Sequence, residues 1–125
     1  MAPNTATMAM RMCLAAGQGD THAVAAWLDE GGGVDAGCAE LKGMTLLMEA
    51  ALGGQGAMVR MLLQRGASVN LQNPNGVTAL MQAAFKGHTT IVQALLDAKA
   101  DASVQTTHGS TALMYAQHQK HTVAV

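Results

Sequence analysis

The feature that most constrains the fold of this chain is a repeat of 33 residues. The stretch "GMTLLMEAALGGQ" begins at Gly43, "GVTALMQAAFKGH" begins at Gly76 and "GSTALMYAQHQKH" begins at Gly109. These three glycines stand 33 residues apart along the chain. A fixed period in this range indicates a repeat architecture, in which similar units bury their apolar faces against one another.

Each repeat begins with the pattern of a short amphipathic helix. Apolar residues follow Thr45 at positions i, i+1, i+3 and i+4, namely Leu47, Met48, Ala50 and Ala51. This spacing places the four side chains on one face of a helix. A threonine directly before such a run is a suitable N-cap, because its hydroxyl can accept from a free amide of the first turn.

A second apolar pattern follows in each full repeat and predicts a second helix. Its members are Met58, Val59, Leu62 and Leu63, and then Ile91, Val92, Leu95 and Leu96. Glycines between the two patterns suit the tight turn of a helical hairpin. The polar segment "RGASVNLQNPNG" after the second helix contains residues that end a helix and form an extended connection.

The repeats divide the chain into a tail and one domain. The segment "LAAGQGDTHAVAAWLDEGGGVD" aligns with the second unit without a gap, which gives a first unit that lacks its opening turn. We therefore predict an N-terminal tail over residues 1–9 and a single domain over residues 10–125. Its units span about residues 10–40, 41–73, 74–106 and 107–125. The last unit is truncated, so we expect the second helix of the third unit to lose part of its cover.

The pattern resembles the ankyrin repeat, whose motifs include T-P-L-H-x-A and L-L-x-x-G-A-D-V-N. The resemblance is carried by "GMTLLMEAA", "GVTALMQAAFKGH", "LLQRGASVN", "LLDAKADAS" and "GSTALMYA" and covers nearly the whole chain. It implies an all-α, ankyrin-type α-solenoid of stacked helix-turn-helix repeats, with short β-turn or hairpin connections.

The chain departs from the family motif at two kinds of position. Methionine stands where the family has histidine, which removes a polar link and predicts looser turns. Lys99 stands where Gly66 closes the previous unit. A left-handed conformation there would cost lysine about 1 kcal/mol relative to glycine, which also predicts a looser turn.

Composition excludes several classes of function. Seven basic and eight acidic side chains leave a net charge of −1, so no basic field exists to bind nucleic acid. No apolar run approaches the roughly 20 residues that span a bilayer, and Arg11 interrupts the N-terminal segment before a secretory signal could form. Two cysteines without a disulfide-rich pattern favour an intracellular location, cytoplasmic or nuclear.

No motif in the sequence indicates catalysis or a cofactor. The chain has no nucleophile beside a base at a recognisable spacing and no glycine-rich phosphate loop after a strand. We therefore expect a protein that is not an enzyme and that needs no cofactor or metal.

In ankyrin-like proteins the binding surface is the concave face, which is made by the turn tips and the exposed side of the first helices. By resemblance, this surface supplies the candidate partner-binding residues of the present chain. They are Met44, Glu49, Leu52, Val77, Gln82, Phe85, Lys86, Tyr115 and His118.

The three aromatic residues differ in their predicted roles. Trp27 aligns with a leucine of a second helix, which predicts a core position. Phe85 and Tyr115 align with exposed positions on the first helices of adjacent units, and aromatic residues are frequent anchors of protein interfaces. An alternative is that Phe85 only covers a neighbouring helix within the stack.

Sulfur and histidine side chains could in principle bind a metal, but other roles are favoured. Soft sulfur ligands bind Cu(I) and three histidines can bind zinc. We favour core packing for the sulfur residues and a solvated surface for the histidines. The sulfur residues share one repeat position, at Cys13, Met48, Met81 and Met114, and the histidines are His108, His118 and His121.

Two further residues have both a functional and a structural interpretation. Equivalents of Asn70 in ankyrin-like proteins can be hydroxylated, although a turn residue that bonds its own backbone is the favoured interpretation. Cys38 lies in an irregular connection, where an exposed thiol could be reactive.

The resemblance predicts a monomeric protein–protein interaction module, a scaffold or adaptor, that binds another protein on its concave face. Two alternatives remain open at the level of sequence. One is an inhibitor that occludes an enzyme such as a kinase, and the other is a non-catalytic targeting segment of a larger multidomain protein.

Overall fold

The computed structural model describes residues 5–117 of the chain, and helical hairpins account for most of them. The first hairpin pairs α1 (Thr5–Gln18) with α2 (Thr21–Asp29), the second pairs α3 (Leu46–Leu52) with α4 (Gly56–Gln64), and the third pairs α5 (Ala79–Lys86) with α6 (Thr89–Asp97). Residues 112–117 are again helical. Two short antiparallel strands, β1 (Gly37–Cys38) and β2 (Met44–Thr45), flank a 3-10 turn at Ala39–Leu41.

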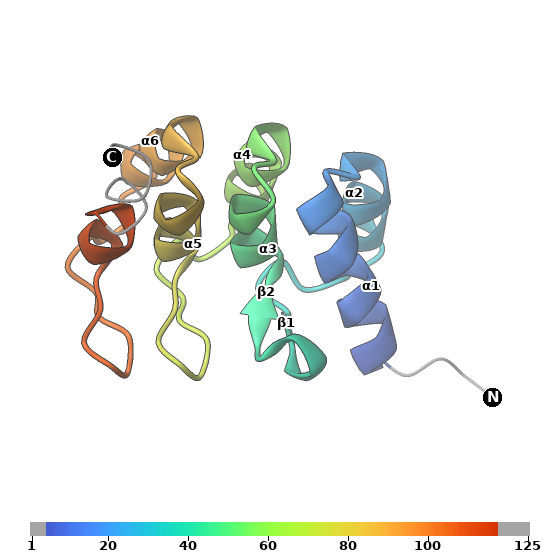
Figure 1. The fold of residues 1–125 in the computed structure, drawn as a ribbon. Helices are drawn as coiled ribbons and strands as arrows, with labels where there is room; N and C mark the ends of the chain where they lie inside the picture. The colour runs from blue at the N-terminus through green and yellow to red at the C-terminus, as the bar shows by residue number, and fades with distance from the viewer. Residues whose placement is uncertain (1–4, 118–125) are drawn as a thin grey trace.

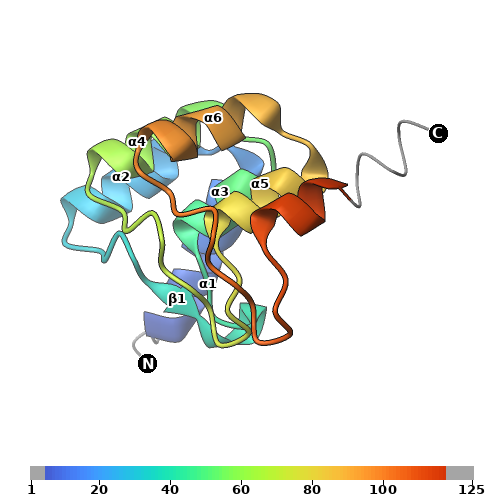
Figure 2. The ribbon, with the colours of Figure 1, turned by 90° about the vertical axis from the view of Figure 1, so that its left-hand side faces the viewer.

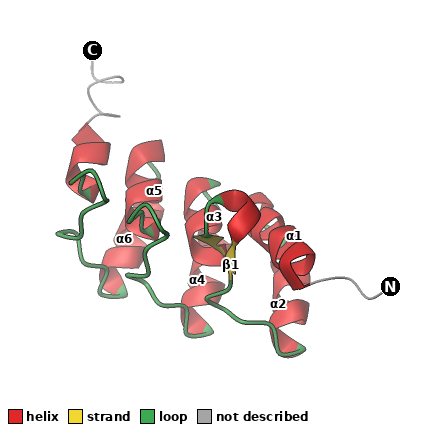
Figure 3. Cartoon of the chain, turned by 90° about the horizontal axis from the view of Figure 1, so that it is seen from below, coloured by secondary structure: helices red, strands yellow, loops and turns green. Residues whose placement is uncertain are grey.

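The hairpins stand side by side in one row (Figure 1). The first helices α1, α3 and α5 contact one another in sequence, and so do the second helices α2, α4 and α6. The connecting loops extend to one side of the row, below the first helices (Figures 2 and 3). The predicted helix-turn-helix repeat is therefore confirmed, and the predicted hairpin connection is present between the first two units.

A threonine caps the first helices of the second and third units, α3 and α5, as the sequence predicts. The hydroxyl of Thr45 accepts from the backbone N–H of Met48 at 3.3 Å, and that of Thr78 accepts from the N–H of Met81 at 3.3 Å. The methionine sulfur completes the cap in return. It accepts from the N–H of Thr45 at 3.5 Å and from the N–H of Thr78 at 3.4 Å. The prediction that methionine removes a polar link is thus wrong, because the thioether is itself a weak acceptor.

The repeated glycines form the turn tips, where the backbone is left-handed. Gly43, Gly76 and Gly109 have φ values of 73°, 81° and 80°. A Cβ on Gly76 would lie 2.8 Å from the Cα of Thr106 in the next turn, and the N–H of Thr107 donates to the carbonyl of Asn75 at 2.9 Å. The 33-residue period thus marks a conformation that favours glycine and a contact between successive turns.

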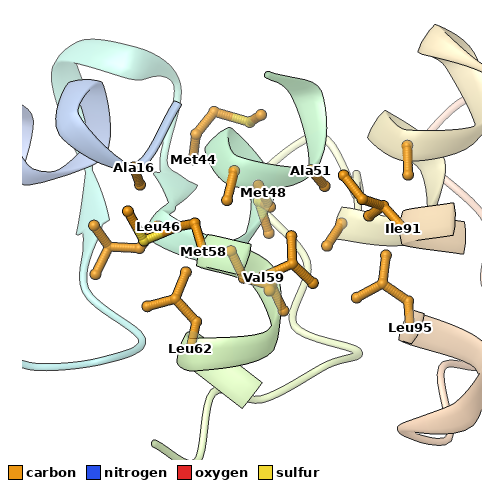
Figure 4. Packing of buried hydrophobic residues seen from close by; sticks show 14 of the residues in the cluster. Ala16, Met44, Leu46, Met48, Ala51, Met58, Val59, Leu62, Ile91 and Leu95 are labelled. Carbon is orange, nitrogen blue, oxygen red and sulfur yellow. The ribbon is translucent and has the colours of Figure 1, made fainter. Parts of the chain in front are cut away.

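The hydrophobic core runs along the row between first and second helices (Figure 4). Met58, Val59 and Leu62 of α4 are fully buried, and Ile91 and Leu95 of α6 face the same layer. Burial of such a side chain contributes roughly 1.5–3 kcal/mol. Neighbouring pairs therefore supply the stability that an isolated hairpin lacks.

The row ends differently at the fourth unit. Leu80 of the third unit is 3% exposed, whereas Leu113 at the equivalent position is 63% exposed. The expected loss of cover in α6 is confined to Leu96, which is 40% exposed, since Ile91 and Leu95 stay buried.

The first helix is longer than the repeat pattern predicts. It begins at Thr5, so residues 5–9 extend the helix, whereas the repeat pattern predicts a tail there. The repeat alignment cannot reveal this extension, because later units have a turn at the corresponding place. Alanine, methionine and arginine after Thr5 are good helix formers, which explains the early start.

Trp27, for which the sequence predicts a core position, packs against the core from a half-buried position.

Lys99 adopts the left-handed conformation that its alignment with Gly66 predicts. Its φ is 75°, against 91° for Gly66. The turn is no looser, because the N–H of Ala100 donates to the carbonyl of Leu95 at 2.9 Å, as the N–H of Ala67 does to Leu62 at 3.0 Å.

Replacing Lys99 with glycine should stabilise the protein by about 1 kcal/mol, because glycine adopts this backbone conformation without strain. Urea denaturation followed by circular dichroism measures the change. The reverse substitution Gly66→Lys is the matched control and should lower the free energy of unfolding by a similar amount, since no neighbouring atom lies near that position. Equal stability of K99G and the unmodified chain would contradict the assignment of strain to Lys99.

Candidate functional site

The predicted partner-binding residues differ widely in exposure. Phe85 and Lys86 are exposed on α5, and Met44 is buried in β2. The half-buried candidates are Glu49, Leu52, Val77, Gln82 and Tyr115. His118 lies outside the described residues, as does His121.

Met44 is not available to a partner, which corrects its assignment as a turn-tip contact. Its side chain is 7% exposed, and its sulfur accepts from the side-chain amides of Asn73 at 3.5 Å and Gln82 at 3.7 Å. The residue lies opposite Cys38 in the pairing of β1 with β2. This pairing turns the methionine inward, and the sequence pattern of the turn alone does not reveal it.

Val77 stands at the equivalent place in the next unit and is half-buried. Its backbone N–H donates to Oδ1 of Asn73 at 2.9 Å. The same Asn73 donates from its Nδ2 to the carbonyl of Lys42 at 3.1 Å, so it links two turn tips. The tips are therefore ordered by polar side chains that the repeat pattern does not mark as functional.

Phe85 and Tyr115 meet at the junction between the third and fourth units. Their ring centroids lie 6.0 Å apart and their planes are at 89°, which is an edge-to-face contact. Such pairs contribute about 0.5–1.5 kcal/mol beyond the area that they bury. Phe85 nevertheless stays 36% exposed. It therefore covers a neighbouring helix, as the alternative interpretation predicts, and also presents part of its surface to solvent.

A lysine lies above the ring of Phe85. The Nζ atom of Lys86 is 5.8 Å from the centroid of the Phe85 ring, within the range of a cation–π contact. This end of the face therefore combines apolar surface with one positive charge.

An acidic residue, Glu49, lies at the other end of the predicted binding surface of the first helices. Glu49 of α3 lies beside Gly17 of α1, where an added Cβ would stand 3.6 Å from its Oε1 atom. Burial raises the pKa of Glu49 above its usual range. Neighbouring first helices thus contact each other in different ways along the row. Two aromatic rings meet at the junction of the third and fourth units, and a carboxylate lies against a glycine at the junction of the first and second units.

The sulfur residues form a buried column for most of its length. Cys13, Met48 and Met81 are buried, and Met114 is 51% exposed in the fourth unit. Among residues 5–117 no group of three or more histidine, cysteine, aspartate or glutamate side chains is placed to bind a metal.

Neither cysteine presents an activated thiol. Cys38 is buried, which corrects the expectation that it could be exposed, and burial raises its pKa. Burial, followed by the charges of Cys38 and Glu49, raises the pKa of Cys13 to about 12. Both side chains therefore remain neutral thiols at physiological pH.

Asn70 bonds the backbone of the next unit rather than its own, which corrects the local turn role that the sequence favours. Its Oδ1 accepts from the backbone N–H of Asp101 at 2.7 Å, and Asp35 accepts in the same way from the N–H of Ser68 at 2.8 Å.

A shallow groove also lies between the first turn tips. It is lined by Gly37, Ala39, Lys42, Gly43, Pro74 and Asn75. The sequence pattern does not predict this groove, because it forms only when successive tips stack.

No helix between residues 5 and 117 combines the length and the apolar character that a bilayer crossing requires.

Comparison with known families agrees with the repeat geometry. A family model described as ankyrin repeats (3 copies) matches residues 12–106 and residues 57–125. A comparison with curated proteins finds no match to the chain. Ankyrin repeats are generally protein–protein interaction modules and are typically non-catalytic. Since the matched residues span most of its length, the chain belongs to the ankyrin repeat family.

Proposed function

We propose that the chain is a protein-binding module and that the partner docks on one face of the first helices. We call this surface the inner face. It consists of Glu49, Leu52, Gln82, Phe85, Lys86 and Tyr115.

The observation that carries the proposal is the aromatic pair at Phe85 and Tyr115. Phe85 is 36% exposed, and the exposed part of its ring costs solubility without contributing to packing, so this exposure favours a role in binding. Tyr115 holds it edge-to-face, which fixes its orientation before a partner arrives. Rigid aromatic anchors of this kind contribute a large share of the energy of many protein interfaces.

The double substitution of Phe85 and Tyr115 by alanine tests this proposal. We expect the amount of captured partner to fall about 10-fold or more, because removal of an interface hot spot costs about 2 kcal/mol or more, and about 1.4 kcal/mol is a tenfold change in affinity. Affinity capture with the unmodified chain as bait, followed by quantitative mass spectrometry, measures the change. Circular dichroism should show the helical signal largely retained.

The matched control is Leu96→Ala. Leu96 is also an exposed apolar residue, but it belongs to the second helix α6. It should leave partner capture unchanged. Equal capture by the double variant and the unmodified chain would move the binding site away from Phe85 and Tyr115.

The identity of the captured protein also separates the more specific roles. A kinase whose activity falls when the chain is added would indicate an inhibitor. A partner that retains its activity and is held beside a second protein would indicate a scaffold. We favour a monomeric scaffold or adaptor because the inner face offers a binding surface without a catalytic group.

A further inference from the structure

The first two turn tips meet in a different way from the last two. The first tip joins β1 to β2, the second precedes α5 and the third follows α6 (Figure 1). Between the last two tips, the N–H of Thr107 donates to the carbonyl of Asn75 at 2.9 Å. One unit earlier the donor position holds Pro74, which has no N–H, and the acceptor position holds Lys42. The equivalent backbone bond therefore cannot form between the first two tips.

The proline ring stands between these two tips and leaves a groove. A Cβ on Gly43 would meet the side-chain Cδ of Pro74 at 2.6 Å, whereas a Cβ on Gly76 would meet a backbone atom of the next tip at 2.8 Å. The carbonyl of Lys42 accepts instead from the side-chain amide of Asn73 at 3.1 Å. The groove has a volume of about 550 Å³, which is in the range of sites that bind small ligands or side chains.

Lys42 supplies this groove with a positive charge that no acid of the described residues neutralises. Its side chain is exposed and lines the groove together with Ala39 and Pro74, which are apolar. The nearest acid along the chain, Glu40, accepts from the thiol of Cys38 at 3.3 Å. The only ion pair in the described part of the chain joins the ends of α2 and α4. The groove thus combines apolar walls with one unpaired cation.

The backbone at Lys42 gives no reason for a lysine. Its φ is 59°, in the left-handed region that glycine adopts without strain. Residues held in such conformations cluster at functional sites. Lys99 is left-handed as well, with a φ of 75°, but it follows α6 and is not part of the groove. Strain alone therefore does not mark a site, and the groove is what distinguishes Lys42 from Lys99.

We propose that the groove binds a peptide segment of a partner protein through an aspartate or a glutamate. The carboxylate pairs with the ammonium group of Lys42, and a neighbouring apolar residue of the peptide packs against Ala39 and Pro74. Complementary charge selects the partner, and a hydrogen bond between two charged groups is among the stronger polar contacts. This site lies on the turn tips and goes beyond the proposed function, because it does not depend on the inner face.

Peptide selection on matched variants tests the inference. A phage library of random peptides is selected in parallel on the unmodified chain, on Lys42→Gly and on Lys99→Gly. The unmodified chain and K99G should both select peptides with an aspartate or glutamate beside an apolar residue, and K42G should not. These peptides should bind K42G about 10-fold more weakly than the unmodified chain, because one charge-assisted contact is lost. Lys42→Arg keeps the charge and should retain the affinity.

Two further measurements separate binding from folding and locate the site. K42G should unfold at a higher urea concentration than the unmodified chain, because glycine adopts this conformation without strain, so unfolding cannot explain its loss of affinity. When a selected peptide is added to the isotope-labelled chain, NMR should show shifts of the amide resonances of Gly37, Gly43 and Asn75, which line the groove.

The outcomes distinguish this inference from the proposed function. F85A/Y115A should bind the acidic peptides as tightly as the unmodified chain does. A library that yields no peptide with an acidic preference, or acidic peptides that bind K42G and the unmodified chain equally, would overturn the groove site and leave the inner face as it stands. Acidic peptides that bind K42G but not F85A/Y115A would also overturn it, because they would place the acid on the inner face.

Discussion

Replacing Leu80 with alanine is expected to lower the free energy of unfolding by about 2–5 kcal/mol. Leu80 lies on α5, is 3% exposed and belongs to the hydrophobic core, so its truncation leaves a cavity inside the stack. A loss of this size is a large fraction of the stability of a small domain. Urea denaturation followed by circular dichroism measures it directly.

The chain provides its own control for this substitution. Leu113 occupies the same place in the fourth unit but is 63% exposed, so Leu113→Ala should change the free energy of unfolding by less than about 1 kcal/mol. Equal losses for the two variants would mean that Leu113 is covered in solution by something that the stack of residues 5–117 does not supply.

Replacing Gly76 with alanine should cost about 2–5 kcal/mol, because two effects combine. The φ of 81° strains any residue with a Cβ by about 1–2 kcal/mol. The new Cβ would also stand 2.8 Å from the Cα of Thr106, a backbone atom that cannot rotate away, and such overpacking costs about 1–3 kcal/mol.

The comparison with Gly109 separates these two effects. Gly109 has a φ of 80°, but no atom lies within reach of an added Cβ. Gly109→Ala should therefore lose only the contribution of strain, about 1–2 kcal/mol. The difference in denaturation midpoint between the two variants reports the packing of one turn tip on the next. If both variants lost the same stability, the contact between Gly76 and Thr106 would contribute nothing.

Patterns that repeat are what the sequence predicts well in this chain. The Thr45 and Thr78 caps and the helical pairs follow from local spacing, because each involves residues within one turn or one helix of each other. The placement of Phe85 and Tyr115 on the first helices of adjacent units also follows. Their edge-to-face contact does not, since the two residues occupy different repeat positions.

Features that arise between units were not predictable in the same way. The burial of Met44 depends on the pairing of β1 with β2, which occurs at only one connection among residues 5–117. The raised pKa of Glu49 depends on desolvation at the junction with α1, and spacing gives no measure of desolvation. The start of α1 at Thr5 was not predictable because no later repeat contains an equivalent segment.

The thioether groups of Met48 and Met81 determine how the caps of α3 and α5 respond to pH and to oxidants. A thioether gains no proton between acidic and alkaline solution, whereas an imidazole in its place would change charge near neutrality. Acidification therefore leaves these two caps unchanged. Peroxide is the reagent that would alter them, because it converts the thioether into a polar sulfoxide, and it can reach these 1% exposed side chains only when the stack opens.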